Sequence, residues 1–289
     1  MKLFGFPATL VHGDLLVLDR WRYLCKRLPI TQNGERLLDV GCGSGAFTIG
    51  AARRGYRAIG LSWDERNQTV AAERAQMCGV TNTDFVIGDV RRLGSLVGLS
   101  DSYDVVICLE CIEHILDDLK LVRDMAAKIK PGGRLLLTTP NYFYVPISPG
   151  DRGPFRAEET GWHVRRGYTA AMLTELCQLS GLTCSEITYC SGFVSQKVTA
   201  VWRQAGRLPG GAAVRWALTL PLRLVAAGFP DHVFGKAIGW PFFSICLEAY
   251  KPRFGEPRLW KDSDSGTRLF GEVRRGWESR LERIDGRED

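Results

Sequence analysis

The sequence lacks any apolar stretch long enough to cross a membrane, because no run reaches the about 18 to 20 uninterrupted apolar residues that a spanning helix needs. The apolar start, residues 1–7, is too short for a secretion signal. The nine cysteines are odd in number and have no regular, tight spacing. These absences argue against a membrane-spanning chain and a disulfide framework, and we expect a reduced, cytoplasmic protein.

A strong charge bias is also missing. The chain has 289 residues, of which 45% are hydrophobic and 24% charged, with a net charge of +6. This composition is typical of a globular protein, and the length suffices for one core and an insertion or small extra domain. A charge this mild permits an acidic partner or a membrane surface but favours neither. We find no aromatic and basic stacking motif of the nucleic-acid-binding kinds, and expect no nucleic-acid partner.

Residues 36–62, RLLDVGCGSGAFTIGAARRGYRAIGLS, predict a strand, a glycine turn, a helix and a second strand. In this βαβ unit the glycines stand at the first turn, where the backbone can approach a ligand at the positive end of a helix. The Lys-Ser/Thr pair of a phosphate-binding P-loop is missing. The third glycine comes one position too early for the G-x-G-x-x-G dinucleotide fingerprint.

Strands and helices alternate along the rest of the chain. This alternation predicts an α/β fold with a doubly wound, mostly parallel sheet, whose ligands lie at the carboxyl ends of the strands. We expect strands at 37–40, 57–61, 84–90, 103–109, 134–140, 182–189 and 242–250, and helices at 14–28, 46–52, 64–78, 116–129 and 168–181.

Residues 38–45, LDVGCGSG, resemble the first motif of class I S-adenosylmethionine-dependent methyltransferases. Later segments match this family in order and spacing, over about residues 14–191 and again 242–250. The resemblance implies a seven-stranded, Rossmann-like sheet with a helical insertion before the last strand.

The resemblance also implies which residues bind S-adenosylmethionine. Gly41, Gly43 and Gly45 would approach its methionyl tail, and Asp39 would anchor its ammonium group. The ribose usually meets an acidic residue at the end of the second strand, but this chain has Ser62 there. The cyclopropane-fatty-acid synthase branch also has a hydroxyl residue at this place, and a hydroxyl binds the ribose more weakly than a carboxylate does.

Five further residues are candidates for the expected cofactor site. Asp64 is an alternative partner for the ribose, and Trp63 either packs on the adenine or belongs to the core. By resemblance, Asp89 would accept a hydrogen bond from the adenine amino group, with the Val90 backbone amide beside it. We also assign Glu110, at the end of the fourth strand, to the cofactor site.

Residues 110–114, ECIEH, carry the second chemical motif. If Glu110 begins a helical turn, Glu113 and His114 lie on the same face of it. This pattern resembles the ubiquinone-biosynthesis O-methyltransferases and, more distantly, the small-RNA 2′-O-methyltransferases, in which two glutamates and two histidines hold Mg²⁺. His163 lies where the second histidine is expected, so Glu110, Glu113, His114 and His163 are candidate metal ligands. Without a metal, His114 or His163 is the best general base, and the motif then only borders the pocket.

Residues 193–241 form an insertion before the last strand in the fold that the resemblance implies. From residue 187 to residue 230 the chain has no Asp or Glu, but it has Lys197, Arg203, Arg207, Arg215 and Arg223. Residues 214–225, VRWALTLPLRLV, are apolar with sparse arginines. Two interpretations remain open: a helical cap folded on its own protein, or a segment, 205–230, that rests on the inner face of a membrane or covers a lipophilic substrate.

We therefore expect a core of residues 1–192 and 242–252, and a peripheral or disordered tail from residue 253 with at most a short helix at 274–283. The expected function is O-methylation of a hydroxyl on a small or lipophilic metabolite, with S-adenosylmethionine as cofactor and Mg²⁺ as an open alternative. Two other functions in the same fold are N- or C-methylation and methylation of a lipid-linked glycan. From another class, a non-catalytic cofactor-binding regulator or scaffold is favoured only by Ser62.

Overall fold

The computed structural model describes residues 5–11, 15–100, 102–206 and 211–253 of the chain. Two compact units separate at residue 255, and the second, residues 256–289, lies outside the described residues. The tail that we expect from residue 253, with its short helix at 274–283, therefore falls almost entirely outside them.

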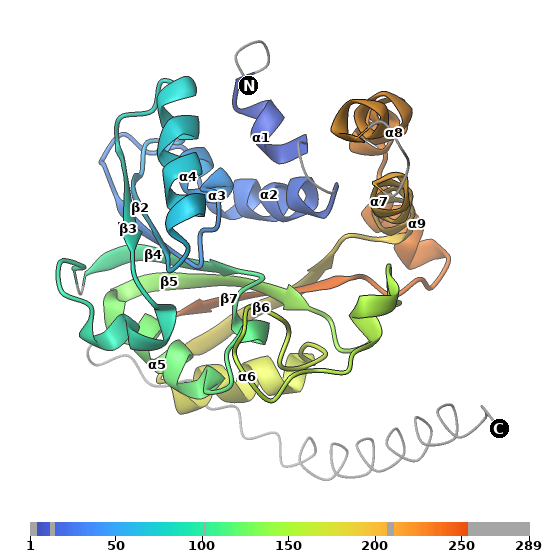
Figure 1. Ribbon diagram of the computed structural model, residues 1–289. Coiled ribbons are helices and arrows are strands. Elements are labelled where there is room, and N and C mark those ends of the chain that lie inside the picture. The colour runs from blue at the N-terminus through green and yellow to red at the C-terminus, as the bar shows by residue number, and fades with distance from the viewer. Residues whose placement is uncertain (1–4, 12–14, 101, 207–210, 254–289) are drawn as a thin grey trace, which may run out of the picture. The chain divides into compact units, whose positions relative to one another are not determined.

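Seven strands form one sheet in the order β3-β2-β1-β4-β5-β7-β6 (Figure 1). Strands β1 to β5 pair in parallel, and β7 runs antiparallel to both β5 and β6. The predicted doubly wound, mostly parallel sheet is thereby confirmed. The bounds are β1 Arg36–Val40, β2 Arg57–Ser62, β3 Thr83–Ile87, β4 Tyr103–Leu109, β5 Ile129–Pro140, β6 Thr183–Cys190 and β7 Ser244–Tyr250.

Helices cover both faces of the sheet, as Figure 1 shows. One face carries α1 Pro7–Val11, α2 Leu15–Arg27, α3 Ala46–Ala52 and α4 Glu65–Met77, and the other carries α5 Asp118–Lys128 and α6 Ala170–Leu179. Side-chain caps fix where three of them begin, because Asp64, Asp117 and Thr169 accept hydrogen bonds from backbone N–H groups in the first turns of α4, α5 and α6. Both faces bury apolar side chains of the strands, which makes the sheet the centre of the core.

The expected boundary before β5 is wrong. We expect Pro131-Gly132-Gly133 to separate helix and strand, yet α5 ends at Lys128 and β5 begins at Ile129. Lys251, the residue after β7, forms backbone hydrogen bonds with this segment. Gly132 N donates to Lys251 O at 2.7 Å, and Lys251 N donates to Gly133 O at 2.9 Å. Pairing with a residue distant in the sequence thus overrides the local turn signal.

Three helices form the insertion between β6 and β7: α7 Phe193–Ala205, α8 Gly211–Gly228 and α9 Asp231–Ala237. Three arginines among the described residues of the insertion contact other parts of the protein or other helices of the insertion. Arg203 donates to Ser148 and Asp151, Arg215 lies 3.5 Å from the centre of the Trp202 ring, and Arg223 is buried. This arrangement agrees with the interpretation of the insertion as a cap on its own protein.

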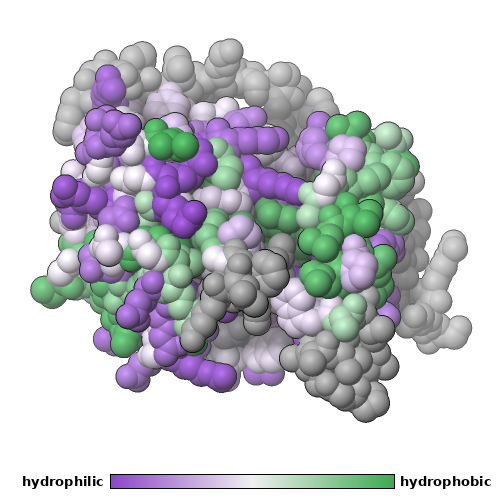
Figure 2. Space-filling view, turned by 90° about the horizontal axis from the view of Figure 1, so that it is seen from above, coloured by the Kyte–Doolittle hydropathy of each residue, from purple (hydrophilic) through white to green (hydrophobic). Residues whose placement is uncertain are grey.

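The outer side of the insertion is apolar, however. Figure 2 shows hydrophobic side chains gathered over it, on the right of that view. We call this surface the α8–α9 face; its exposed members are Leu220, Leu222, Leu224, Val225, Phe229, Val233, Phe234 and Ile238. Among the described residues, no helix combines the length and apolar character that crossing a membrane requires.

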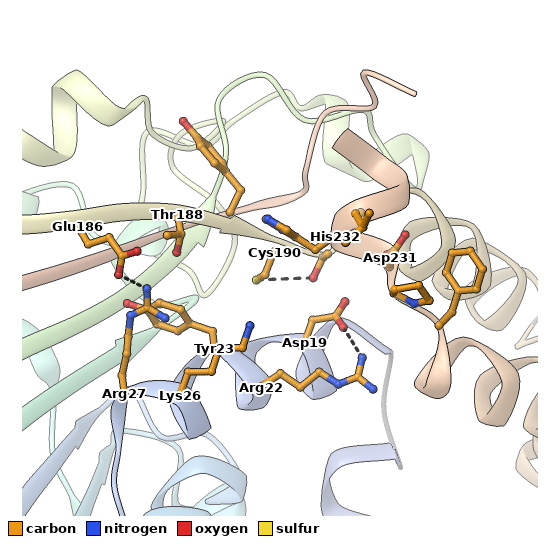
Figure 3. A pocket seen from close by; sticks show the side chains of 16 residues that line it. Asp19, Arg22, Tyr23, Lys26, Arg27, Glu186, Thr188, Cys190, Asp231 and His232 are labelled. Atoms are coloured by element: carbon orange, nitrogen blue, oxygen red, sulfur yellow. Dashed lines mark hydrogen bonds and ion pairs between the residues drawn. The ribbon is translucent and has the colours of Figure 1, made fainter. Parts of the chain in front are cut away.

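A cavity of about 440 Å³ lies where α2, β6 and the turn between α8 and α9 meet (Figure 3). Tyr23 and Lys26 enter it from α2, Thr188 from β6 and His232 from α9. Its lining carries three basic side chains of Lys or Arg and three acidic ones, so its formal charges balance. Among the residues that the structure describes, its lining includes none that we predict for the cofactor or the chemistry.

Candidate functional site

The glycine loop after β1 has the geometry that a close-approaching ligand needs. Gly41, Gly43 and Gly45 have φ angles of +81°, +51° and +77°, which side-chain-bearing residues rarely adopt. A Cβ on Gly41 would lie 2.5 Å from Cys111 Sγ, and one on Gly45 would lie 2.7 Å from a methyl group of α4. A Cβ on Gly43 would have no described atom within 4 Å. Packing therefore requires two of these glycines, whereas Gly43 borders open space that a ligand can fill.

Asp39 lies at the end of β1 and is only 1% exposed. Its Oδ2 accepts a hydrogen bond from Thr48 Oγ1 at 2.7 Å. Burial raises the pKa of Asp39 to about 7, and the Thr48 hydroxyl offsets part of this effect. No ion pair to Asp39 is found among the described residues, so this carboxyl group retains the capacity to pair with the ammonium group of a ligand.

The end of β2 contains Ser62, Trp63 and Asp64. Ser62 is 6% exposed, and its Oγ accepts a hydrogen bond from Asp64 N at 3.3 Å. Trp63 is 67% exposed, so the interpretation of Trp63 as a core residue is wrong, and its ring is accessible to a ligand. Asp64 caps α4 by accepting hydrogen bonds from the backbone and side-chain nitrogens of Asn67. That role leaves Ser62 as the better candidate for the ribose.

Asp89 follows β3 and begins the short 3-10 helix η1, Val90–Ser95. Its Oδ2 lies 2.6 Å from an Nη of Arg91, and hydrogen bonds from Arg91 hold the pKa of Asp89 below its ordinary value. The second Nη of Arg91 lies 2.8 Å from Glu159. Val90 is buried, so its side chain serves the core. No motif in the sequence indicates that Arg91 and Glu159 lie at this site.

Glu110 does not begin a helical turn, which corrects our expectation. Its φ is +52°, and the short 3-10 helix η2 starts two residues later, at Ile112–His114. The Glu110 carboxylate points to Arg20 of α2, at 2.9 Å, and accepts hydrogen bonds from Thr138 and Ser244. Glu110 therefore lies outside the group that Glu113, His114 and His163 form, and the expected four-ligand metal set is not assembled.

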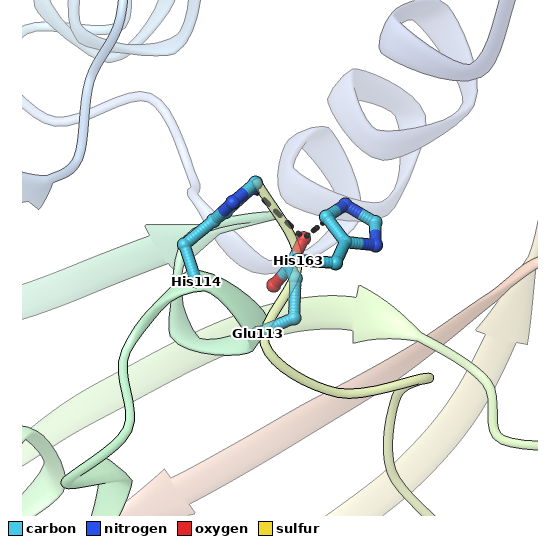
Figure 4. Close-up of side chains that lie close together, drawn as sticks. All are labelled: Glu113, His114 and His163. Atoms are coloured by element: carbon cyan, nitrogen blue, oxygen red, sulfur yellow. Dashed lines mark ion pairs between the residues drawn. The ribbon is translucent and has the colours of Figure 1, made fainter. Parts of the chain in front are cut away.

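Those three side chains do come together (Figure 4). Glu113 is completely buried, and its Oε1 lies 3.9 Å from Nε2 of His114 and 3.9 Å from Nε2 of His163. The centres of the two imidazole rings are 4.7 Å apart. A backbone hydrogen bond from Val164 N to Glu113 O, 3.0 Å long, brings the distant His163 to this place.

Burial sets the protonation of this group. It lowers the pKa of His163 to about 4, with a smaller effect of the neighbouring His114, and it also lowers the pKa of His114. Burial and the Glu110 carboxylate raise the pKa of Glu113 well above its ordinary value. At neutral pH both imidazoles are therefore uncharged, and their contacts with Glu113 are not ion pairs. Uncharged imidazoles can accept a proton or bind a metal ion.

Comparisons with known proteins agree with this arrangement. A family model described as a methyltransferase domain matches residues 17–187. The ubiquinone biosynthesis O-methyltransferase of Marinobacter nauticus is 34% identical over 122 residues, which are 42% of this chain and 50% of that protein. The enzyme of the same name from Coxiella burnetii is 29% identical over 165 residues, 55% of this chain and 68% of that one. The chain thus spans about half the length of several curated relatives that it matches.

Among solved structures, the cyclase SpnF has a TM-score of 0.56 at 23% identity and covers 82% of both chains. A neighbour that is named a cyclase shows that this likeness concerns the fold alone. The family model matches more than half of the chain, including the glycine loop, Asp89 and the Glu113–His114 pair. The chain belongs to the methyltransferase domain family.

Proposed function

We propose that this protein transfers the methyl group of S-adenosylmethionine to a hydroxyl group of a small or lipophilic metabolite. One observation carries the proposal: β1, which leads into the glycine loop, pairs directly with β4, which leads to Glu113 and His114. Cofactor and acceptor would therefore meet at the carboxyl edge of two adjacent parallel strands. The relatives named ubiquinone biosynthesis O-methyltransferase support the choice of a hydroxyl acceptor.

Some of these residues would bind the cofactor, and others would transfer the proton of the acceptor. The cofactor would supply an electrophilic methyl group on a sulfonium, and the protein would mainly align it with the acceptor. The backbone at Gly43 and the buried Asp39 fit the methionyl tail, and Ser62 and Trp63 fit the ribose and adenine. His163, neutral because of its burial, would take the proton of the acceptor hydroxyl, with His114 as the alternative base.

Calorimetric titration with S-adenosylhomocysteine tests the cofactor site. We expect the wild type to bind, and Gly43→Val and Asp89→Ala to abolish binding. Gly98→Val is the matched control, because Gly98 has a φ of +89° and similarly open space outside the site. Asp84→Ala controls for the loss of an exposed carboxylate nearby. If the wild type does not bind, both the methyltransferase and a cofactor-binding regulator are refuted, and a scaffold that has lost the cofactor remains. Binding without turnover on any acceptor would favour the non-catalytic regulator, and screening acceptors distinguishes O-methylation from N- or C-methylation and from methylation of a lipid-linked glycan.

We propose further that Glu113, His114 and His163 can hold a divalent metal ion that polarises the acceptor hydroxyl. Two imidazoles and one carboxylate suit Zn²⁺ or Fe²⁺ better than Mg²⁺, which prefers oxygen ligands. Thermal unfolding with and without a chelator tests this, since a bound ion raises the melting temperature. If neither a chelator nor added Zn²⁺, Mn²⁺ or Mg²⁺ changes the melting temperature or turnover, the metal is excluded and the histidines act as bases.

We propose last that residues 205–230, together with α9, contact the inner face of a membrane. The α8–α9 face is apolar, and the exposed charges close to it, Lys197 and Lys236, are basic. Vesicles of anionic lipid should co-sediment the wild type but not a Leu224→Asp/Val233→Asp variant. Val97→Asp is the matched control, because Val97 is 97% exposed and lies outside the insertion. Equal sedimentation of all three proteins would leave the insertion as a cap only.

A further inference from the structure

Arg91 binds two carboxylates that belong to different parts of the site. Its Nε and one Nη donate hydrogen bonds of 2.6 to 2.9 Å to the Asp89 carboxylate, and its backbone N–H donates to the same group at 2.9 Å. Its other Nη donates to Glu159 Oε2 at 2.8 Å. Arg91 thus bridges the end of β3 and the segment that follows β5.

Glu159 contacts the chain just after His114 and lies in the same segment as His163. Its second oxygen, Oε1, accepts a hydrogen bond from Leu116 N at 2.6 Å, two residues after His114. His163 follows four residues later in the same segment, and its carbonyl oxygen accepts a hydrogen bond from Arg156 N at 3.2 Å. The position of Glu159 therefore helps to fix the position of His163.

The ion pair between Arg91 and Glu159 contributes little to stability by itself. The Arg91 side chain is 49% exposed, whereas Glu159 is 17% exposed, so water screens the cation of this pair and limits what the pair adds to stability. Asp89, however, is the carboxylate that the adenine amino group would need. Arg91 already donates to both of its oxygens, so the adenine amino group would compete with Arg91 for the lone pairs of this carboxylate.

We propose that Arg91 and Glu159 are positioning residues that couple the cofactor site to His163. When adenine takes a hydrogen-bonding position at Asp89, it weakens the contact between Asp89 and Arg91, and Arg91 strengthens the contact that it already makes with Glu159. The segment that carries His163 is then held more tightly when the cofactor is bound. This inference rests on the proposed function and adds to it that cofactor binding further restricts the segment that carries the base.

Hydrogen exchange of backbone amides tests the coupling, with S-adenosylhomocysteine as the probe. In the wild type we expect the probe to slow exchange in residues 156–165 by about tenfold. Arg91→Ala and Glu159→Gln should each reduce this protection to less than about threefold, and the double variant should be no worse than either single one. Glu159→Gln leaves Asp89 and Arg91 intact, so it must still bind the probe in calorimetry. Arg92→Ala, which removes a neighbouring exposed charge, is the control and should behave as the wild type does.

The outcomes separate the two proposals. If the wild type binds the probe and protection persists in Glu159→Gln, the coupling is refuted while the cofactor site stands. Faster exchange that is equal with and without the probe would mean that Glu159 only stabilises the segment, and this too refutes the coupling. Absence of probe binding by the wild type would remove the cofactor site and the coupling together.

Discussion

The guanidinium group of Arg20 lies 2.9 Å from Oε2 of Glu110, and this ion pair joins helix α2 to the end of β4. The two side chains are only 10% and 17% exposed. Glu110 has a φ of +52°, an unusual backbone conformation for a residue with a side chain. Such backbone is typical of functional sites, where the surrounding contacts have to maintain it.

Replacement of Arg20 by Met should destabilise the protein by about 2 kcal/mol, because it leaves a largely buried carboxylate without its cation. The double variant Arg20→Met/Glu110→Gln should recover part of this loss, since the charge is then also absent. Urea unfolding measures both changes. Lys120→Met breaks a more exposed pair with Asp124, in which the cation is 50% and the carboxylate 18% exposed, together with a hydrogen bond from Lys120 to Arg91 O. Because water screens this cation and Gly94 N still donates to Asp124, the substitution should cost at most about 0.5 kcal/mol. Equal costs for the buried and the exposed pair would contradict this account.

Asp39→Asn should stabilise the protein at pH 8 but not at pH 4. The folded-state pKa of Asp39 is about 7, above the unfolded value of about 3.9, so the folded state binds the extra proton between these pH values. Stability due to this group is present below pH 4 and is lost as the pH rises toward 7, by roughly 4 kcal/mol at most. Asparagine does not ionise, so the Asp39→Asn variant does not lose this stability as the pH rises. The measurement is urea unfolding of both proteins from pH 4 to pH 8.

The same substitution should weaken binding of S-adenosylhomocysteine by more than about tenfold, because an amide cannot pair with the ligand's ammonium group. A stability difference between wild type and Asp39→Asn that stays constant over the pH range would show that Asp39 titrates normally. Unchanged affinity would show that the ammonium group binds elsewhere.

Gly45→Ala and Gly43→Ala should separate a structural glycine from a ligand-binding one. An alanine Cβ at Gly45 collides with α4 and adopts an unfavourable φ, so we expect a loss of about 3 kcal/mol. At Gly43 no described atom is in the way, and only the backbone cost of about 1 kcal/mol remains. Calorimetry should then show a larger loss of S-adenosylhomocysteine affinity for Gly43→Ala than its stability explains. The prediction is wrong if this variant keeps the affinity of the wild type.

His163→Asn should lower kcat by ~10²-fold or more once an acceptor is found, because it removes the base but keeps a polar side chain of similar length. Affinity for S-adenosylhomocysteine should stay within about threefold of the wild type, since His163 acts on the acceptor. His232→Asn is the control, because His232 lies in the cavity outside this site. A normal turnover number for His163→Asn would transfer the role of base to His114.

The sequence by itself determined most of the fold. Apolar periodicity and capping residues are local signals, so the strands and the helices α2 to α6 lie within a few residues of the predicted ranges, apart from the start of β5. Helix α1 was not predicted, and the insertion was predicted only as helical, without bounds for its helices. The glycine motif and the family resemblance located the glycine loop after β1 for the same reason: D-x-G-x-G-x-G is a contiguous pattern. His163 was predicted only because the resemblance pointed to it.

Tertiary structure alone decided what each charged side chain contacts. Spacing within a turn suggested that Glu110 joins Glu113 and His114, yet a positive φ directs its carboxylate to Arg20, a residue far away in the sequence. Arg91 and Glu159 carry no motif, and their pairing depends on the fold bringing η1 beside the segment after β5. In the sequence the arginines of the insertion suggest a basic surface, but among the described residues Arg215 and Arg223 pack on Trp202 and Arg203 binds Asp151. Local patterns specify backbone conformation, whereas partners distant in the sequence are chosen only when the sheet assembles.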